Sequence, residues 1–544
     1  MAPLRPRAEL ATHTVLNQPE PLASLPLWEA DAPLRTAVAR LAPAHASRLA
    51  AFAGRLGSAE VLGWGRDANR HPPELRQFDR AGRRVDEVAF HPAYHELLRL
   101  GLEAGYAALP WTADPTGGHV AHAAMVYLMT QVEPGVCCPM TMTYAAVPAL
   151  AATPALAARW RPGLTSARYD PDSRPAAEKS ALTIGMAMTE KQGGSDLRAN
   201  TTRAEADGEG YRLWGHKWFC SAPMCDGFLT LAQLEEGLTC FVVPRWQPDG
   251  TRNRLELVRL KDKLGNRANA SAEIEYHGAW AERLGAPGRG VATIIEMVHH
   301  TRLDTAMAPA GLMRRALAEA AWWSRGRAAF GRPLADQPLM QMVLADLALE
   351  WLGALAAGLR VAAAFDRAAA DLGERAFARI GVALAKYWSN KRCPAVVAEA
   401  MECLGGSGYV EEGDLPWLYR EAPLNAIWEG SGNIVCLDVL RTLERVPDAL
   451  EALRAELELG RGASRAYDAA LAAAFDRYKR GVPEAEARRF VEALALLLQA
   501  SELLRHGEPV AAETFVVTRL GGDWGRTFGT LPAATDAARI AALI

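Results

Sequence analysis

The hydrophobic pattern of this 544-residue chain changes period twice, and that change limits the folds open to it. Up to about residue 180, Leu, Ala and Trp recur at helical spacing, and prolines interrupt the helices. From about 181 to 290 the spacing is typical of short β-strands, and after residue 290 the helical spacing returns. The pattern predicts a multidomain α+β protein in which a β domain lies between two helical blocks.

One hairpin and several shorter strands predict the β domain. Residues 201–206 and 211–218 have strand character and flank a glycine-containing turn at 207–210. Further strands are expected at 228–233, 239–244, 255–260 and 271–276, and together they predict a barrel-like or sandwich domain. The expected domains are N-terminal helices at 1–180, the β domain at 181–290, a four-helix bundle at 291–443 and a helical extension at 444–544.

Long helices are expected in the third block. Asp336 is placed to cap a helix whose first turn contains Pro338. Between 339 and 352 the polar residues are only Gln341, Asp346 and Glu350, so that helix is expected to be buried on most sides. Another helix is expected from about 376 to 405, where a glycine pair suits a C-terminal cap.

Composition predicts a soluble cytoplasmic protein with reduced thiols. The chain is half apolar and 23% charged, with a formal net charge of −3, so overall charge gives no support for nucleic-acid binding. The N-terminus lacks the apolar stretch of a signal peptide, and no run reaches the roughly 18 to 20 apolar residues of a membrane span. None of the eight cysteines forms a CxxC pair, so buried thiols and no metal site are expected.

Three glycine- or hydroxyl-containing segments predict a binding site. Residues 188–196 read MTEKQGGSD after an apolar run, residues 217–221 read KWFCS, and residues 427–433 read IWEGSGN. Backbone N–H groups in glycine turns approach phosphate and ring oxygens closely because glycine has no Cβ. Taken singly, the first segment is equally compatible with a binding loop and with an ordinary turn. The second is equally compatible with a binding strand and with a core strand.

In this order and at this separation, the segments resemble the acyl-CoA dehydrogenase superfamily of flavoproteins. They are most similar to its AidB-type branch, which belongs to the adaptive response to DNA alkylation. The resemblance covers the chain to about residue 443, and the AidB-like sequence begins near Thr12. Helical, β and helical blocks in this order are the architecture of the superfamily, and the C-terminal extension is typical of the AidB-type branch.

The resemblance implies a non-covalently bound FAD. Thr189 would donate to the isoalloxazine ring, Ser195 to the pyrophosphate and Ser221 to N5, while Phe219 would pack on the ring. The implied cofactor-binding residues are Met188, Thr189, Gly194, Ser195, Phe219, Cys220, Ser221, Arg327, Phe330, Gly405, Gly406, Ile427, Trp428, Gly430, Ser431, Gly432 and Asn433.

The resemblance also implies a homotetramer built as a dimer of dimers. Arg327 and Phe330, in a turn that reads RAAFGRP, would reach the adenosine half of an FAD held by a neighbouring subunit. The glycine-rich turn at 402–409 would lie against the same cofactor. Without the resemblance, Arg327 is more typical of a solvated cation at a helix end.

Glu429 lies at the usual position of the catalytic base in the family, where a carboxylate removes the α-proton of an acyl-CoA. Some members place this glutamate immediately before a core-helix arginine, but here Thr301 precedes Arg302, so Glu429 is the sole candidate. The alternative is a structural acid paired with Arg302 or Arg441, and an arginine neighbour would hold the carboxylate ionised.

The implied substrate pocket contains Thr141, Thr301, Arg302 and Arg441. Thr141 belongs to an irregular segment at 133–143, which is equally compatible with ordinary packing between helices. Family members usually have tyrosine before the catalytic glutamate and threonine after the glycine, where this chain has Trp428 and Ser431. A bulkier ring beside the base predicts slow dehydrogenation of small branched substrates such as isovaleryl-CoA.

The resemblance implies that the extension contacts double-stranded DNA, but its charge does not favour this. From residue 444 to 544 there are thirteen Arg and Lys and fifteen Asp and Glu, a net charge of −2. Local clusters remain around Arg477, Lys479 and Arg480 and at 488–489, and solvated helix faces are the alternative interpretation.

Three functions remain open at this point. The first is an AidB-type flavoprotein of the alkylation response that binds DNA and keeps weak activity on an acyl-CoA or another small molecule. The second is a metabolic dehydrogenase of short or branched acyl-CoA with an extension that does not bind DNA. The third is a scaffold that FAD stabilises and that performs no catalysis.

Overall fold

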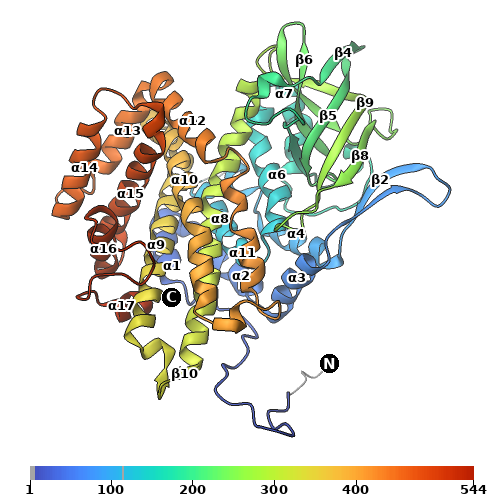
Figure 1. Ribbon diagram of the computed structural model, residues 1–544. Coiled ribbons are helices and arrows are strands. Elements are labelled where there is room, and N and C mark those ends of the chain that lie inside the picture. The colour runs from blue at the N-terminus through green and yellow to red at the C-terminus, as the bar shows by residue number, and fades with distance from the viewer. Residues whose placement is uncertain (1–5, 113–115) are drawn as a thin grey trace.

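The computed structural model describes residues 6–112 and 116–544. Long helices of the third block cross the middle of the molecule, with the β domain at one end and the extension on the opposite side (Figure 1). The fold is therefore the predicted α+β arrangement of helical block, β domain, helical bundle and helical extension. This is the order of blocks that the resemblance to the acyl-CoA dehydrogenase superfamily implied.

The N-terminal block is mainly helical. Its helices are α1 (Ala32–Leu41), α2 (Ala46–Leu56), α3 (Ala59–Arg70), α4 (Pro92–Ala104), α5 (Gly118–Thr130), α6 (Cys137–Leu150) and α7 (Pro154–Leu164). The purely helical prediction is wrong at one place, because β1 (Glu74–Phe78) and β2 (Arg84–Ala89) form an antiparallel hairpin. Gln77 of this hairpin donates to the carbonyl of Leu257 at 2.8 Å, so the hairpin is fixed against the β domain.

The β domain contains seven strands that form a small barrel. They are β3 (Ile184–Ala187), β4 (Arg203–Asp207), β5 (Gly210–Ser221), β6 (Gly227–Leu234), β7 (Gly237–Pro244), β8 (Leu255–Leu260) and β9 (Ser271–Leu284). The barrel closes because β7 pairs with both β6 and β9, while β4 and β5 complete the circuit. The predicted hairpin is confirmed, with Asp207 opposite Gly210. Sequence patterning missed β3 and the second half of β9.

Three long helices form the bundle. They are α8 (Gly290–Gly326), α9 (Pro338–Arg367) and α10 (Leu372–Glu402), followed by α11 (Leu415–Glu421) and α12 (Gly432–Arg445). A two-residue ladder of β10 (Ala328–Ala329) and β11 (Arg332–Pro333) joins α8 to α9. The predicted cap at Asp336 is wrong, because Asp336 closes a short 3₁₀ turn and Gln337 takes the N-cap position without a side-chain bond.

Helix α9 is the one described helix that is long and apolar enough to cross a membrane by length and composition. Most of its apolar window is buried inside the fold, as in a core helix. Its polar stripe has a partner: Arg519 of the extension contacts Asp346 and lies 3.0 Å from Glu350. The narrow stripe predicted from sequence is therefore the seam between α9 and the extension.

The extension packs along the bundle. Its helices are α13 (Pro447–Glu458), α14 (Arg465–Arg477), α15 (Ala487–His506), α16 (Pro509–Phe515) and α17 (Ala537–Ala541), with a π-turn at Val516–Leu520. Arg360 of α9 donates to Glu456 at 2.6 Å, and Arg505 donates to the same carboxylate at 2.9 Å. These ion pairs attach the extension to the bundle.

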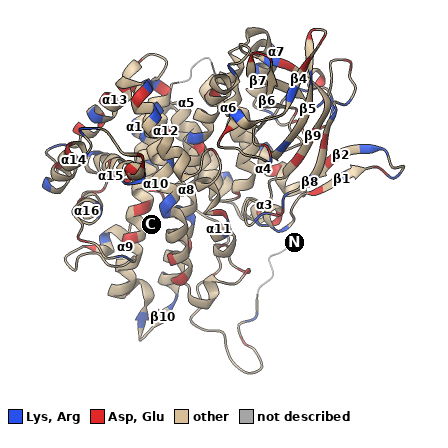
Figure 2. Ribbon diagram, turned by 45° about the horizontal axis from the view of Figure 1, so that its top comes forward, with Lys and Arg blue, Asp and Glu red and all other residues tan. Residues whose placement is uncertain are grey.

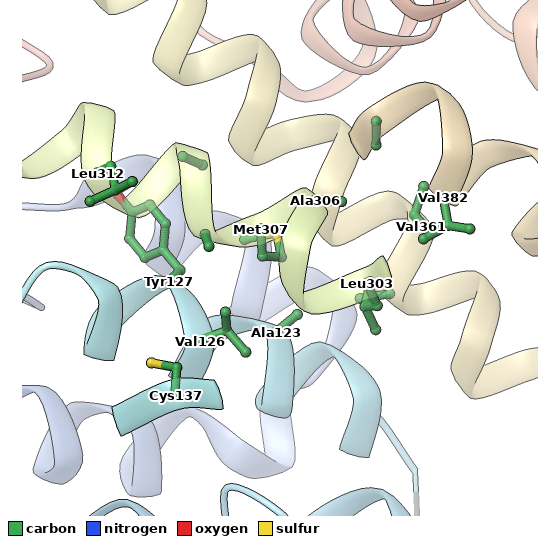
Figure 3. Packing of buried hydrophobic residues seen from close by; sticks show 14 of the residues in the cluster. Ala123, Val126, Tyr127, Cys137, Leu303, Ala306, Met307, Leu312, Val361 and Val382 are labelled. Atoms are coloured by element: carbon green, nitrogen blue, oxygen red, sulfur yellow. The ribbon is translucent and has the colours of Figure 1, made fainter. Parts of the chain in front are cut away.

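The main core lies where α5, α6, α8, α9 and α10 meet (Figure 3). Small residues let the backbones approach: a Cβ added at Gly311 of α8 would lie 2.5 Å from the carbonyl oxygen of Tyr127. All eight cysteines are free, and seven of them are buried. This agrees with the predicted reduced thiols.

Candidate functional site

Glu429 stands on a strained turn between a short 3₁₀ helix (Leu424–Ala426) and α12. Its φ is 55°, in the left-handed region that costs a non-glycine residue about 1–3 kcal/mol, and Gly430 follows with φ 99°. Two buried cations hold the turn. Arg302 Nε donates to the Glu429 carbonyl at 3.1 Å, and Lys386 Nζ donates to the Gly430 carbonyl at 2.8 Å. Backbone strain maintained by specific partners is typical of functional sites.

The carboxylate of Glu429 is bonded to a hydroxyl and not to an arginine. Thr301 Oγ1 donates to Glu429 Oε2 at 2.6 Å. The Arg302 guanidinium is engaged by Asp438 at 2.6 Å, and Arg441 is exposed and 3.9 Å from the same aspartate. The arginine pairing considered from the sequence is therefore wrong for this carboxylate, because Asp438 takes both cations.

Burial raises the pKa of Glu429, and the Thr301 hydrogen bond and the charges of Arg302 and Lys386 offset only part of that effect. The expectation of a firmly ionised acid is thereby corrected. Burial also lowers the pKa of Lys386 to about 7, with the charge of Arg302 acting in the same direction. A carboxyl with a raised pKa and an amine with a lowered one meet at one turn, as in sites tuned for proton transfer.

Sequence reasoning missed Lys386 although it identified the helix that carries it. Lys386 is 1% exposed and also donates to the Asn425 carbonyl at 3.0 Å. The signal was present in the sequence, since this lysine interrupts a run of Val, Ala, Leu, Tyr and Trp at 382–388. A buried lysine without a carboxylate partner suggests a function more strongly than a surface lysine does.

The first two predicted flavin segments are joined within the barrel. The Trp218 N–H donates to the Thr189 carbonyl at 2.7 Å. Lys217 Nζ donates to Glu190 Oε1 at 2.7 Å, and neither side chain is exposed to solvent. Because strand residues alternate between faces, Phe219 is 49% exposed while the Cys220 side chain is fully buried in the barrel. A contact of the Cys220 side chain with a cofactor outside the barrel is thus excluded, whereas Phe219 faces outward, which its predicted packing on a flavin ring requires.

Other predicted residues of the first segment lie near the same edge. Met188 and Thr189 are half-buried, and Ser195 is exposed in the loop that follows. A Cβ added at Gly194 would lie 2.6 Å from Thr189 Oγ1, so this loop requires the close approach that glycine allows. The hydroxyls of Thr189 and Ser195 therefore lie along a turn that a phosphate or a ring oxygen can approach.

Cys138 of α6 is electrostatically linked to the Glu429 turn. The pKa of its thiol responds to the charges of Lys263 and Glu429. Burial raises that pKa to about 12, so the thiol is protonated. Among the described residues, both amide atoms of buried Asn269 lack a hydrogen-bond partner. A buried amide whose donor and acceptor atoms are both unpaired suits the polar edge of a ring such as isoalloxazine.

Thr141 is buried more deeply than a residue that lines a substrate pocket. It is 9% exposed, and its hydroxyl donates to Asp304 of α8. Tyr106 donates to the same carboxylate oxygen at 3.1 Å. The residue therefore helps form a buried polar network behind the site.

The third predicted segment leads directly into α12 and contacts the extension. Ser431 takes the N-cap position, and Asn433 Oδ1 accepts from Arg488 of α15 at 2.8 Å. A Cβ at Gly432 would lie 3.1 Å from Lys391 Nζ. Ile427 is 64% exposed on this surface. Arg488 was seen in the sequence only as part of a charged cluster, since its contact depends on the packing of the extension.

Arg327 and Phe330 are not brought to Glu429 within one chain. They follow the far end of α8, about 40 Å of helix away from Thr301. The β10–β11 ladder, which Arg327 precedes and whose turn contains Phe330, lies at the end of the bundle opposite the β domain (Figure 1). Phe330 is 98% exposed with φ 54°, and Gly405 and Gly406 are exposed in a separate turn.

Family comparisons agree with this geometry. The profile for the N-terminal domain of the adaptive response protein AidB matches residues 17–171. Those for the acyl-CoA dehydrogenase middle and C-terminal domains match 185–279 and 288–444. The putative acyl-CoA dehydrogenase AidB of Escherichia coli K12 is 46% identical over 93% of this chain and 94% of its own length. The chain belongs to the acyl-CoA dehydrogenase family. Within the family it is of the AidB type.

Solved members of the family share the fold. Caenorhabditis elegans ACDH-11, solved in complex with C11-CoA, has a TM-score of 0.83 at 29% identity over 95% of this chain and 93% of that one. An acyl-CoA dehydrogenase from Bacillus anthracis, solved with FAD, has a TM-score of 0.65 at 19% identity over 79% of this chain and 81% of that one, which shows the fold alone. Acyl-CoA dehydrogenases are FAD-dependent flavoproteins.

Proposed function

We propose that this chain is a cytoplasmic AidB-type flavoprotein that binds FAD non-covalently and dehydrogenates acyl-CoA slowly, with Glu429 as the base. The observation that carries the proposal is the Glu429 turn, where Thr301 donates to the buried carboxyl group and Arg302 and Lys386 hold the backbone carbonyls. Thr189, Ser195, Phe219 and Ser221 would hold the cofactor, which supplies a two-electron hydride acceptor when bound.

The chain's own residues perform the proton step. Glu429 Oε1, the oxygen that Thr301 does not occupy, would accept the α-proton of the thioester. Its raised pKa makes it a stronger base than a surface glutamate. Arg302 and Lys386 hold the carbonyls of the turn, so the carboxylate stays in place while its charge changes.

Trp428 is expected to narrow the acyl pocket beside Glu429, which favours a small or narrow acyl group. Its indole Nε1 donates to Asn425 Oδ1 at 2.6 Å, so the ring is fixed beside Glu429. The relative solved with C11-CoA supports an acyl thioester as the ligand class. We expect turnover of isovaleryl-CoA well below that of a metabolic dehydrogenase assayed in parallel. A comparable turnover would favour the alternative of a metabolic enzyme of short or branched acyl-CoA.

We further propose a homotetramer in which Arg327 and Phe330 reach the FAD of a neighbouring subunit. A phenylalanine that is 98% exposed, on a turn far from its own Glu429, supports this arrangement. Phe330→Ser is expected to weaken subunit association by about 10- to 100-fold, because burying one phenylalanine contributes about 1.5–3 kcal/mol.

Light scattering after gel filtration, with the FAD content of each peak, measures this effect. Phe78→Ser is the matched control, since Phe78 is also exposed but lies on the β1–β2 hairpin. A Phe330→Ser protein that keeps both its mass and its FAD would contradict the shared site.

We propose, as a second role, weak association with double-stranded DNA in the response to alkylation. The 46% sequence identity with E. coli AidB supports this role, whereas the charges of the extension limit the affinity expected for DNA. Basic and acidic residues are interspersed over α13, α14 and α15 (Figure 2). At least six of the thirteen basic residues form ion pairs within the chain: Arg461, Arg477, Lys479, Arg505, Arg519 and Arg539.

The cluster of Arg477, Lys479 and Arg480 is the proposed contact. Arg477 lies 2.9 Å from Glu486 and Lys479 lies 2.7 Å from Asp476, so DNA phosphates would have to replace these carboxylates. Tyr478, which lies between these cations, is 9% exposed, so its ring is not free to stack on a base. Changing all three cations to Glu is expected to lower binding to a short duplex at least tenfold at low salt. Unchanged retention across a salt series would remove this cluster from consideration.

A further inference from the structure

The loop that joins β8 to β9, residues 261–270, lies outside the predicted flavin segments and is held between the barrel and the bundle. Asn266 Nδ2 donates to Glu421 Oε1 of α11 at 2.9 Å. A Cβ added at Gly265 would lie 2.4 Å from the carbonyl oxygen of Arg420. Asn266 has a φ of 54°, and backbone strain held by specific partners is typical of functional sites. The β8–β9 loop is therefore fixed against the bundle.

The β8–β9 loop returns to the barrel beside Ser221, the residue implied to contact flavin N5. Ser271 begins β9 and is the cross-strand partner of Ser221 in the antiparallel β5–β9 pair, so both side chains lie on one face. Their hydroxyl oxygens are 3.4 Å apart, and Ser271 is 6% exposed whereas Ser221 is half-buried. Directly after Ser221, Ala222 has a φ of 50° and donates to the Ala270 carbonyl at 2.8 Å. The loop thus sets the position of Ser221.

Lys263 connects the two ends of this loop. Its Nζ donates to Ser271 Oγ at 3.0 Å and also to the backbone carbonyl of Asn269. Both acceptors are uncharged, so these contacts are hydrogen bonds and not ion pairs. Two contacts need only two N–H groups, which a lysine amine carries whether it is charged or neutral. The arrangement consequently does not depend on the charge of Lys263.

The donors along this chain of contacts have a fixed direction. A lysine ammonium only donates, so Ser271 Oγ accepts from Lys263 and keeps its own proton. That proton is available to Ser221 Oγ, which leaves the hydroxyl proton of Ser221 for a group outside the pair. The distance of 3.4 Å between the two hydroxyls is long, and hydrogen bonds at catalytic sites commonly tighten when a ligand binds. The order Lys263, Ser271, Ser221 therefore makes Ser221 a donor.

A donor at this position suits an oxidised flavin. N5 of the oxidised ring has a lone pair that accepts a hydrogen bond, and protein hydrogen bonds to the ring nitrogens tune its electronics. Successive hydrogen bonds polarise one another, so Lys263 and Ser271 strengthen the donor character of Ser221. The same loop offers a second contact, because both side-chain amide atoms of buried Asn269 lack a partner among the described residues.

We propose that the β8–β9 loop is a further cofactor-facing segment, in which Lys263 acts through Ser271 to orient the Ser221 hydroxyl as a donor to flavin N5 and so favours flavin reduction. Lys263 and Ser271 are positioning residues, because they act through Ser221. The effect on the flavin rests on Ser221 being the N5 contact of the proposed function, whereas it does not require that acyl-CoA is the substrate.

The midpoint potential of bound FAD, measured by dithionite titration with a reference dye and without acyl-CoA, tests this chain. Ser271→Ala is expected to lower the equilibrium constant for flavin reduction about tenfold, which is a shift of about 30 mV to more negative potential for a two-electron couple. Lys263→Met should produce a shift of similar size. Arg267→Met is the matched control, since Arg267 is an exposed cation of the same loop, and it should leave the potential unchanged.

A double-mutant cycle separates a chain of hydrogen bonds from independent effects. If Lys263 acts through Ser271, the Lys263→Met/Ser271→Ala protein should shift no further than either single variant. Additive shifts would overturn the proposal, because they would show that Lys263 acts on the flavin without Ser271. An unchanged potential in Ser271→Ala would overturn it as well, and this variant removes only one hydroxyl group from the fold.

Two further results distinguish this chain from the proposed dehydrogenase. Ser221→Ala should shift the potential in the same direction, and an unchanged potential would show that Ser221 does not contact N5 and would overturn the chain. If dithionite reduces the flavin of the wild type but acyl-CoA does not, the proposed dehydrogenase fails while the potentials still decide the role of Lys263. A purified wild-type protein that binds no FAD would overturn both.

Discussion

Glu429→Gln is expected to slow the reduction of bound FAD by acyl-CoA by about 10²- to 10⁴-fold, the usual contribution of a positioned general base. The amide keeps the shape of the carboxyl group and still accepts from Thr301, but it takes no proton. Stopped-flow absorbance under anaerobic conditions measures the rate. Acyl-CoA affinity and FAD content should remain within about twofold of wild type, because the substitution leaves the turn and its two cation bonds intact.

The stability of this variant separates a lost base from a damaged fold. The folded-state pKa of Glu429 lies above its ordinary value of 4.5, so the native protein holds more protons than the unfolded chain in that window. Stability therefore falls as pH rises through the window, and the ionised carboxylate costs stability at neutral pH. Glu429→Gln should melt no lower than wild type there. A lower melting temperature would show that the acid supports the fold and is not only a base.

The pH dependence of the wild-type rate follows from the same pKa direction. Reduction should be slow where Glu429 is protonated and should rise with pH, with its midpoint above the ordinary glutamate value of 4.5. Lys386, whose pKa is about 7, loses a positive charge beside the turn over the neutral range. A flat profile from acid to neutral pH would contradict a proton step through Glu429.

Lys217→Met is expected to destabilise the barrel by about 3–5 kcal/mol, the cost of leaving one buried charge without its partner. The side chains of Lys217 and Glu190 are both fully buried, and Lys217 also donates to the Leu231 carbonyl at 2.8 Å. The substitution leaves the Glu190 carboxylate facing a methionine. Because Glu190 follows Thr189 directly, FAD retention should fall together with the melting temperature.

An exposed ion pair in the same domain provides the control. Arg203 lies 3.1 Å from Glu205, with both side chains more than half exposed, so Arg203→Met should change stability by less than about 1 kcal/mol. Equal losses for Lys217→Met and Arg203→Met would show that the buried pair has no special role. Calorimetry of the apo and FAD-loaded forms separates the fold from the cofactor contribution.

The order of the blocks and most strands of the barrel could be predicted because their signals are local. The alternation at 211–218 and the glycine turn before it specify a hairpin without help from the rest of the chain. The hairpin β1–β2 was missed because its strands are short and few of their side chains are buried, and its position depends on contacts such as that between Gln77 and Leu257. The cap of α9 was wrong by one residue, which is usual at helix ends.

The acid of the site could be predicted, but its partners could not. Glu429 stands out because it lies alone between a ring and a glycine turn. Lys386, Cys138 and Asp304 come from three other helices, and only tertiary packing brings them together. The alternative of a Glu429 paired with an arginine failed for the same reason, since the Arg302 guanidinium is paired with Asp438.

Anaerobic titration of the purified yellow protein with isovaleryl-CoA tests the central claim most directly. The visible flavin band is followed to completion, and the acyl-CoA product is identified afterwards. The account predicts slow but complete bleaching of the band with formation of the unsaturated thioester. A band that stays unbleached with isovaleryl-CoA and with C11-CoA, in protein that binds both, would contradict it and would leave a flavin-stabilised scaffold.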